Sequence, residues 1–179
     1  MKRSALVVAL ALVLAAGLAR AEEMKHAGSA VTDTPQWRQI KTLVGEWDGY
    51  AVEGTQKIPT HISIRMTGDG SAVMHWMDAG TPHEMITMFH MDKDTLLATH
   101  YCAAHNQPRM RALPPTQANK IAFEFTDGTN IRPGDGHMSR IAITFVDADH
   151  HDEEWGYDDN GQVHSGTFHL TRVKPAPKT

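Results

Sequence analysis

The sequence predicts an all-β fold, an antiparallel up-and-down β-barrel of about ten strands preceded by one short helix. Three observations support this prediction. From Glu46 onward, short segments alternate apolar and polar side chains, as half-buried strands do. Clusters of Gly, Asp, Asn or Pro separate these segments, and Asn160-Gly161 is typical of a type I′ hairpin turn. Most connections have hairpin length, which favours a closed barrel over the alternative, a sandwich of two sheets.

The first element is an apolar run from Ala5 to Leu18 that follows Lys2 and Arg3. It ends in a small-x-small sequence, so residues 1–21 are expected to be a secretory signal peptide cleaved after Ala21. Removing these 21 of the 179 residues leaves 158. Three basic residues and no acidic residue leave with them, so the formal net charge falls from −4 to −7. The mature protein is then expected to be periplasmic or secreted.

The next elements are a linker and a helix. Residues 22–35 are small and polar, which predicts a flexible mature N-terminus. Thr34 and Pro35 are a helix N-cap and a proline at the first helical position, and the apolar residues that follow have helical spacing up to Gly45. A single barrel domain is expected over 36–174, with a C-terminal tail at 175–179.

The strands follow the helix at regular spacing, each bounded by turn residues. They are expected at 46–53, 59–67, 71–78, 83–91, 95–103, 108–113, 120–126, 138–147, 152–158 and 162–173.

Charge and cysteine content exclude several functions. An acidic domain lacks the basic patches that bind nucleic acids and anionic membranes. Cys102 is the single cysteine, so no internal disulfide can form, and no cysteine directly follows the cleavage site to carry a lipid anchor. No second apolar run has spanning length. The expected partner is therefore a small molecule, and neither a nucleic acid nor a membrane.

The two ends of the barrel domain carry a resemblance. The segment from Leu43 to Gly49 contains a Gly-x-Trp after the short helix and resembles the opening of lipocalin-like, or calycin-type, barrels. The last predicted strand ends in Arg172. Because first and last strands are neighbours in a closed barrel, Arg172 is expected to stack on Trp47 and close one end. The other end would form a cup.

The middle of the chain extends this resemblance over about residues 36–173. Segments 80–85 and 99–110 are similar to uncharacterised exported lipocalin-like domains of bacteria, a family that implies a fold and no established activity. A more distant likeness is to nitrobindin-type haem-binding barrels, which share a Gly-x-Trp-x-Gly opening and place a haem-ligating histidine late in the chain. His164 and His169 lie in the last predicted strand.

Histidine is unusually frequent, with twelve residues. Most are expected to be polar surface residues, and the alternative is a haem or transition-metal site, because imidazole is a common metal ligand and thioethers suit copper. No compact metal-binding motif is present, and the adjacent His150 and His151 point to opposite faces of any strand. The acidic run 147–154 is expected to be a solvated loop, and the alternative is a weak surface cation site.

His100 and Cys102 are two residues apart, so they share one face of a strand. They are either core residues or part of a ligand site completed by Asn106 and Arg109. Histidine, amide and guanidinium groups would together bind a carboxylate or other anionic head group. The predicted ligand-binding residues are His83, His100, Cys102, Asn106 and Arg109, whereas Trp47 and Arg172 are predicted to be structural.

The sequence therefore predicts an exported protein that holds a small, partly apolar ligand in a barrel cup, with an anionic head group as one option. The alternative is a haem- or transition-metal-binding barrel that uses histidines. The third hypothesis is an enzyme in which His100 activates Cys102. A binding protein is favoured over an enzyme and no catalytic residue is assigned, because the sequence lacks nucleophile-elbow, phosphate-loop and dinucleotide-binding motifs.

Overall fold

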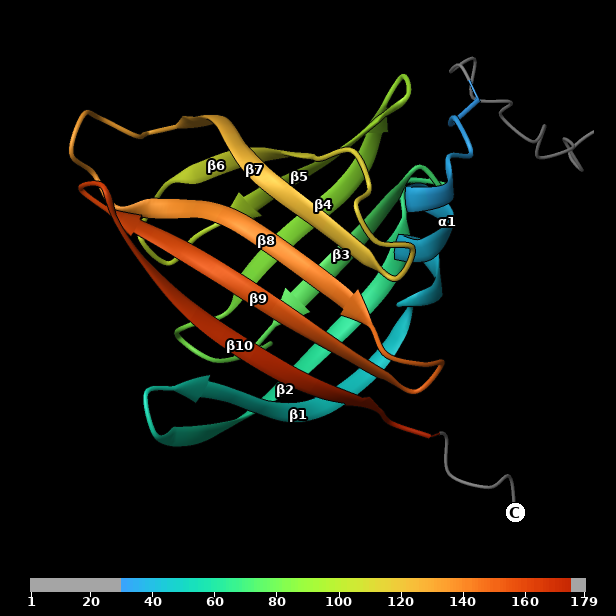
Figure 1. Ribbon diagram of the computed structural model, residues 1–179, viewed down its shortest axis with the longest axis horizontal. Helices are drawn as coiled ribbons and strands as arrows, with labels where there is room; N and C mark the ends of the chain where they lie inside the picture. The colour runs from blue at the N-terminus through green and yellow to red at the C-terminus, as the bar shows by residue number, and fades with distance from the viewer. Residues whose placement is uncertain (1–29, 175–179) are drawn as a thin grey trace, which may run out of the picture. The chain divides into compact units, whose positions relative to one another are not determined.

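The computed structural model describes residues 30–174 and confirms the predicted fold class (Figure 1). Ten antiparallel strands form one closed barrel in the order β1-β10-β9-β8-β7-β6-β5-β4-β3-β2, with one short helix near the N-terminus. The elements are α1 (Pro35–Thr42), β1 (Gly45–Glu53), β2 (Gln56–Thr67), β3 (Ala72–Met77), β4 (Met85–Asp92), β5 (Thr95–Tyr101), β6 (Gln107–Ala112), β7 (Lys120–Thr129), β8 (His137–Phe145), β9 (His150–Asp159) and β10 (Gln162–Arg172).

Three sequence-based expectations cannot be compared with the structure. The signal peptide at 1–21, most of the linker at 22–35 and the tail at 175–179 lie outside the described residues. Within the described part of the chain, no helix is long and apolar enough to cross a membrane.

Every strand pairs with its neighbours in sequence, and the barrel closes where β1 pairs with β10. One expectation is wrong. The acidic run 147–154 is not a solvated loop throughout, because β9 begins at His150 and buries His151 and Glu153 inside the barrel. His150 points outward and is hydrogen-bonded to Asp147. His150 and His151 therefore face opposite sides of the sheet, as predicted.

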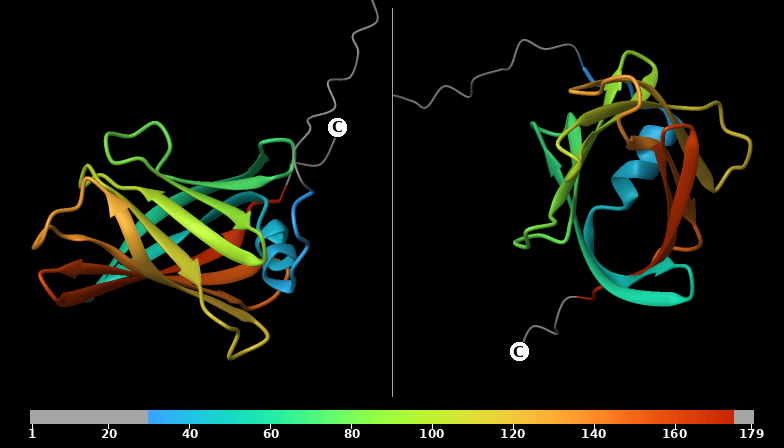
Figure 2. Two further views of the ribbon diagram at one scale, coloured as in Figure 1. Left: turned by 90° about the horizontal axis from the view of Figure 1, so that it is seen from above. Right: turned by 90° about the vertical axis from the view of Figure 1, so that its left-hand side faces the viewer.

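Helix α1 lies across one end of the barrel (Figure 2). Its N-cap forms as the sequence predicts, since the Thr34 hydroxyl accepts a hydrogen bond from the Trp37 backbone N–H at 3.1 Å. Trp37 and Ile40 are buried against the core. Gln36 and Gln39 donate to backbone carbonyls of the β6–β7 connection. The helix therefore closes this end of the barrel.

Arg172 joins the last strand to the first at the same end. Its guanidinium lies 4.1 Å from the centre of the Trp47 ring and donates to the carbonyls of Val44 and Thr42 at 2.9 and 2.8 Å. Gly45 makes this close approach possible, because it has a φ of +148° and a Cβ there would lie 2.6 Å from Arg172 Nη1. The contact satisfies carbonyl groups at the end of α1.

Candidate functional site

The barrel interior contains a buried polar cluster, formed by inward-facing side chains of β3, β4, β5 and β9. Its members are all at most 2% exposed: His75, Thr87, His100, His151 and Glu153. The cluster is bounded toward α1 by Trp47, whose ring lies edge-to-face with His151 at 4.1 Å. On the other side it is bounded by Trp155, whose ring centre lies 5.3 Å from that of His100.

Glu153 is the centre of this cluster. His75 Nε2 lies 3.2 Å from both carboxylate oxygens, and His151 Nε2 lies 3.0 Å from one of them. The Trp155 indole N–H donates to the other oxygen at 2.9 Å. Burial by itself raises the pKa of the carboxyl group, but the charge of His75 and hydrogen bonds from both histidines outweigh burial and hold the pKa below its usual range. Glu153 is therefore a paired, buried carboxylate.

His100 carries a neutral imidazole ring inside the cluster. Its Nδ1 lies 2.8 Å from the Thr87 hydroxyl, and its buried Nε2 has no hydrogen-bond partner among residues 30–174. Burial, and secondarily the charge of His75, lower the pKa of His100 to about 4. Across residues 30–174, no group of three or more His, Cys, Asp or Glu side chains is arranged to hold a metal ion.

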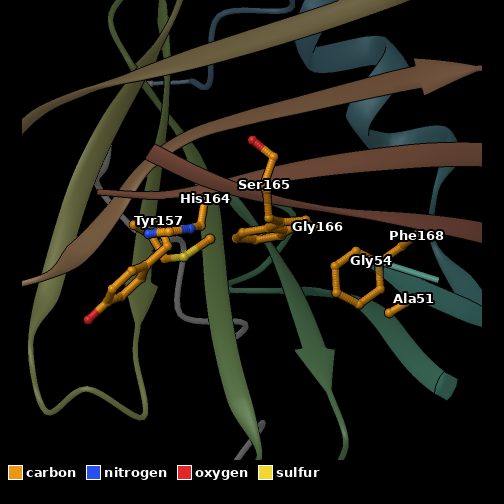
Figure 3. A pocket seen from close by; sticks show the side chains of 9 residues that line it. Ala51, Gly54, Tyr157, His164, Ser165, Gly166 and Phe168 are labelled. Atoms are coloured by element: carbon orange, nitrogen blue, oxygen red, sulfur yellow. The ribbon is translucent and has the colours of Figure 1, made fainter. Parts of the chain in front are cut away.

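A hollow of about 390 Å³, which we call the aromatic hollow, lies at the end of the barrel away from α1 (Figure 3). In Figure 3, Tyr157 and His164 lie at one end of it and Phe168 and Ala51 at the other, whereas the side chain of Ser165 points away. The residues that line it come from β1, β8, β9, β10 and the β1–β2 turn: Ala51, Gly54, Met138, Trp155, Tyr157, His164, Ser165, Gly166 and Phe168.

The pairing of β9 with β10 explains why this space is open. Gly166 lies directly opposite Trp155, and a Cβ at Gly166 would meet no atom within 4 Å. The missing side chain leaves room beside the indole. The Trp155 N–H donates a hydrogen bond to Glu153 in the barrel interior, and this bond fixes the orientation of the indole. The buried cluster therefore supports one wall of the aromatic hollow.

A second hollow of about 310 Å³, which we call the polar hollow, lies between the β5–β6 and β7–β8 connections. Its lining is formed by Ala104, Asn106, Asn130, Arg132, Asp135, Gly136 and Tyr157. Tyr157 therefore lines both hollows. A Cβ at Gly136 would overlap the Tyr157 ring, so the glycine lets this ring lie directly against the backbone. Burial, followed by the charges of Cys102, Asp159 and Asp135, raises the pKa of Tyr157.

Asn106 is the most enclosed residue of the polar hollow, at 2% exposed. Its Nδ2 donates to the Gly136 carbonyl at 2.9 Å, which fixes the orientation of the amide. Its Oδ1 is buried and has no partner among the described residues. An unpaired buried oxygen of this kind costs about 1–3 kcal/mol.

The structure places the five residues predicted to bind ligand in different environments. His83 is exposed in the β3–β4 connection, His100 belongs to the buried cluster, and Asn106 lines the polar hollow. Cys102 is half-buried just after β5, and Arg109 is exposed on β6, where it pairs with Asp127. Only Asn106 lines one of the two hollows, and ligand contacts by the other four stay predictions. Burial raises the pKa of the Cys102 thiol, the opposite of what activates a nucleophile.

Sequence reasoning did not find Glu153, Trp155, Tyr157 or Arg132. A signal for the first three exists, because they follow His151 at a spacing of two residues, as side chains on one face of a strand do. The acidic neighbours Asp152 and Glu154 concealed this pattern.

Comparison with solved structures finds the same fold. Rv2717c from M. tuberculosis is 12% identical with a TM-score of 0.54, and the match covers 80% of this chain and 100% of that one. A protein of unknown function from the DUF3598 family of Nostoc punctiforme is 17% identical with a TM-score of 0.53, and the match covers 82% of this chain and 53% of that one. Neither a family model nor a curated protein matches the chain. At these identities the likeness shows the fold alone.

Proposed function

We propose that the protein binds a small, largely apolar molecule in the aromatic hollow. The observation that carries this proposal is the space beside Trp155 opposite Gly166, at the end of the barrel that α1 does not cover. Its volume of about 390 Å³ is in the range of small-molecule sites. The barrel would then work as a lipocalin-like cup, and the signal peptide expected at 1–21 supports a role outside the cytoplasm.

The lining suits a ligand with an apolar body and a polar end. Met138, Trp155 and Phe168 offer apolar surface, which stabilises a bound molecule by about 25 cal/mol for each Å² removed from water. Tyr157 and His164 provide hydrogen-bonding groups at one end (Figure 3). Because Glu153 holds the indole of Trp155 in place, little freedom is lost when a ligand packs against this wall.

Filling the hollow tests this proposal. In Gly166→Leu the new side chain enters the open space, where a Cβ meets nothing within 4 Å. Thr167→Leu is the matched control, because the next residue of β10 faces the other side of the sheet. We expect the neutral fluorescent probe N-phenyl-1-naphthylamine to bind the unmodified protein and Thr167→Leu equally, and Gly166→Leu at least tenfold more weakly. Equal binding by all three proteins, or no binding by any, contradicts the proposal.

A haem is the second candidate ligand, and the position of one histidine favours it. His164 lines the aromatic hollow, whereas His169 Nδ1 is bonded to Asp152 at 2.8 Å. Imidazole is a common axial ligand of haem iron, and apolar and aromatic walls suit the porphyrin. Bound there, a haem would supply its own redox or gas-binding chemistry.

Titration with haemin distinguishes this candidate. We expect the intense absorption band of free haemin to shift and sharpen when the protein is added, as it does when a histidine ligates the iron. The shift should be lost in His164→Ala and kept in His169→Ala. A shift that survives in His164→Ala excludes His164 as the ligand, and a haemin band that the unmodified protein leaves unchanged excludes haem.

A further inference from the structure

We propose that the polar hollow binds the head group of the same ligand, and that this head group combines a carboxylate with an N–H or O–H donor. The inference rests on the proposed function, because it extends the ligand from the aromatic hollow into the neighbouring one. It assigns the ligand to a chemical class, amphipathic carboxylic acids of the N-acyl amino acid type.

The two hollows are adjacent. Tyr157 lines both, and it pairs across the sheet with Met138 of β8 and with His164 of β10, which line the aromatic hollow. On its other side it packs on Gly136, which lines the polar hollow. A ligand that passes Tyr157 therefore places its apolar body against Trp155 and its head group near Asn106.

Arg132 provides the charge that selects a carboxylate. Its guanidinium makes no ion pair or side-chain hydrogen bond with any residue of the described chain, although it lines the polar hollow. Its backbone N–H is fixed by Asp135, whose Oδ2 accepts at 2.8 Å. A guanidinium with free donors binds a carboxylate through two parallel hydrogen bonds.

The remaining groups require a donor on the same head group. Asn106 Oδ1 is an enclosed acceptor without a partner, and the Asp135 carboxylate is a second acceptor in the lining. A simple fatty acid would satisfy Arg132 and leave the Asn106 acceptor unpaired, whereas Asp135 already accepts from the Arg132 backbone N–H. A sulfate or fully ionised phosphate would do the same, and an alkylammonium would face the guanidinium. A carboxylate beside an amide N–H, as in an N-acyl amino acid, supplies an acceptor for the Arg132 guanidinium and one donor for Asn106 Oδ1.

Three compounds with the same acyl chain separate these contributions. N-octanoylglycine carries both the charge and the N–H, N-octanoylglycinamide lacks the charge, and N-octanoylsarcosine lacks the N–H. Their affinities are measured by isothermal titration calorimetry and by displacement of N-phenyl-1-naphthylamine. We expect N-octanoylglycine to bind about tenfold more tightly than either analogue, the usual effect of one hydrogen bond to a charged group.

Variants identify the residue responsible. We expect Arg132→Gln to weaken N-octanoylglycine about tenfold and to leave N-octanoylglycinamide unchanged. Arg111→Gln is the matched control, since Arg111 is an exposed arginine of β6 paired with Glu124. The inference is overturned if the three compounds bind equally, if none displaces the probe, or if Arg132→Gln behaves like Arg111→Gln. In each case the proposed function still stands provided that the naphthylamine binds and Gly166→Leu weakens its binding at least tenfold.

Discussion

Acidification from pH 7 to pH 4 is expected to lower the free energy of unfolding, because His100 is neutral in the folded protein and protonated in the unfolded chain. The pKa of His100 is held at about 4 by burial and by the charge of His75, against 6.5 in the unfolded chain. Between these values the unfolded chain binds a proton that the folded protein does not bind, so the free energy of unfolding falls as the pH falls. A shift of this size, at 1.36 kcal/mol per pKa unit, corresponds to about 3 kcal/mol.

The assay compares urea unfolding of the unmodified protein and of His100→Asn at several pH values from 7 to 4. Asparagine places an amide near the position of Nδ1, so the hydrogen bond to Thr87 can be kept while the titrating ring is removed. Glu153 has a lowered pKa, so its contribution to the free energy of unfolding also falls in acid. The exposed His61 has a raised pKa, so its contribution rises as the pH falls. Both are present in each protein, so the difference between the two curves reports His100.

We expect the free energy of unfolding of the unmodified protein to fall about 3 kcal/mol more than that of His100→Asn between pH 6.5 and pH 4. Parallel curves would refute the assignment of His100 as a buried, neutral imidazole.

Three further predictions concern single substitutions. Glu153→Gln leaves buried histidines without their carboxylate and should lower the free energy of unfolding by about 3–5 kcal/mol in urea, whereas Glu154→Gln, at a half-exposed residue of the outer face, should change it little, and similar losses would contradict the pairing. Gly45→Ala combines a strained φ with a clash against Arg172, so it should cost about 1–3 kcal/mol in thermal unfolding, and an unchanged Tm would show that this contact is dispensable. If Arg109 binds the head group, as the sequence predicts, Arg109→Ala weakens N-octanoylglycine binding in calorimetry, and equal affinity contradicts that prediction.

The barrel could be predicted because its signals are local. Alternation within a strand and turn residues such as Asn160-Gly161 depend on only a few neighbouring residues. Because each strand pairs with the next one along the chain, the order of the predicted strands also gives their order in the barrel. The helix at Pro35 was predictable for the same reason, since its N-cap lies beside it in sequence.

The hollows could not be predicted, because they depend on which residues meet across the closed sheet. Glu153 looks solvated in sequence, and only the contact with His75 on β3 identifies it as an interior carboxylate. The sequence pattern points to Arg109 as the anchor and gives no reason to select Arg132, yet the fold places Arg109 beside Asp127 on the outer face and Arg132 in the polar hollow. A strand shift of one residue would exchange the two faces of a strand.

The contact between Arg172 and the β1 end also sets the order in which the barrel can assemble. Every other strand pair joins neighbours in sequence, so these pairs can form one after another as the chain is made. The pairing of β1 with β10 joins the two ends of the domain, so it can form only after the residues of the final strand have been made. Until they arrive, β1 presents a free edge that a second chain could pair with. A chain truncated before β10 is therefore expected to aggregate through that edge.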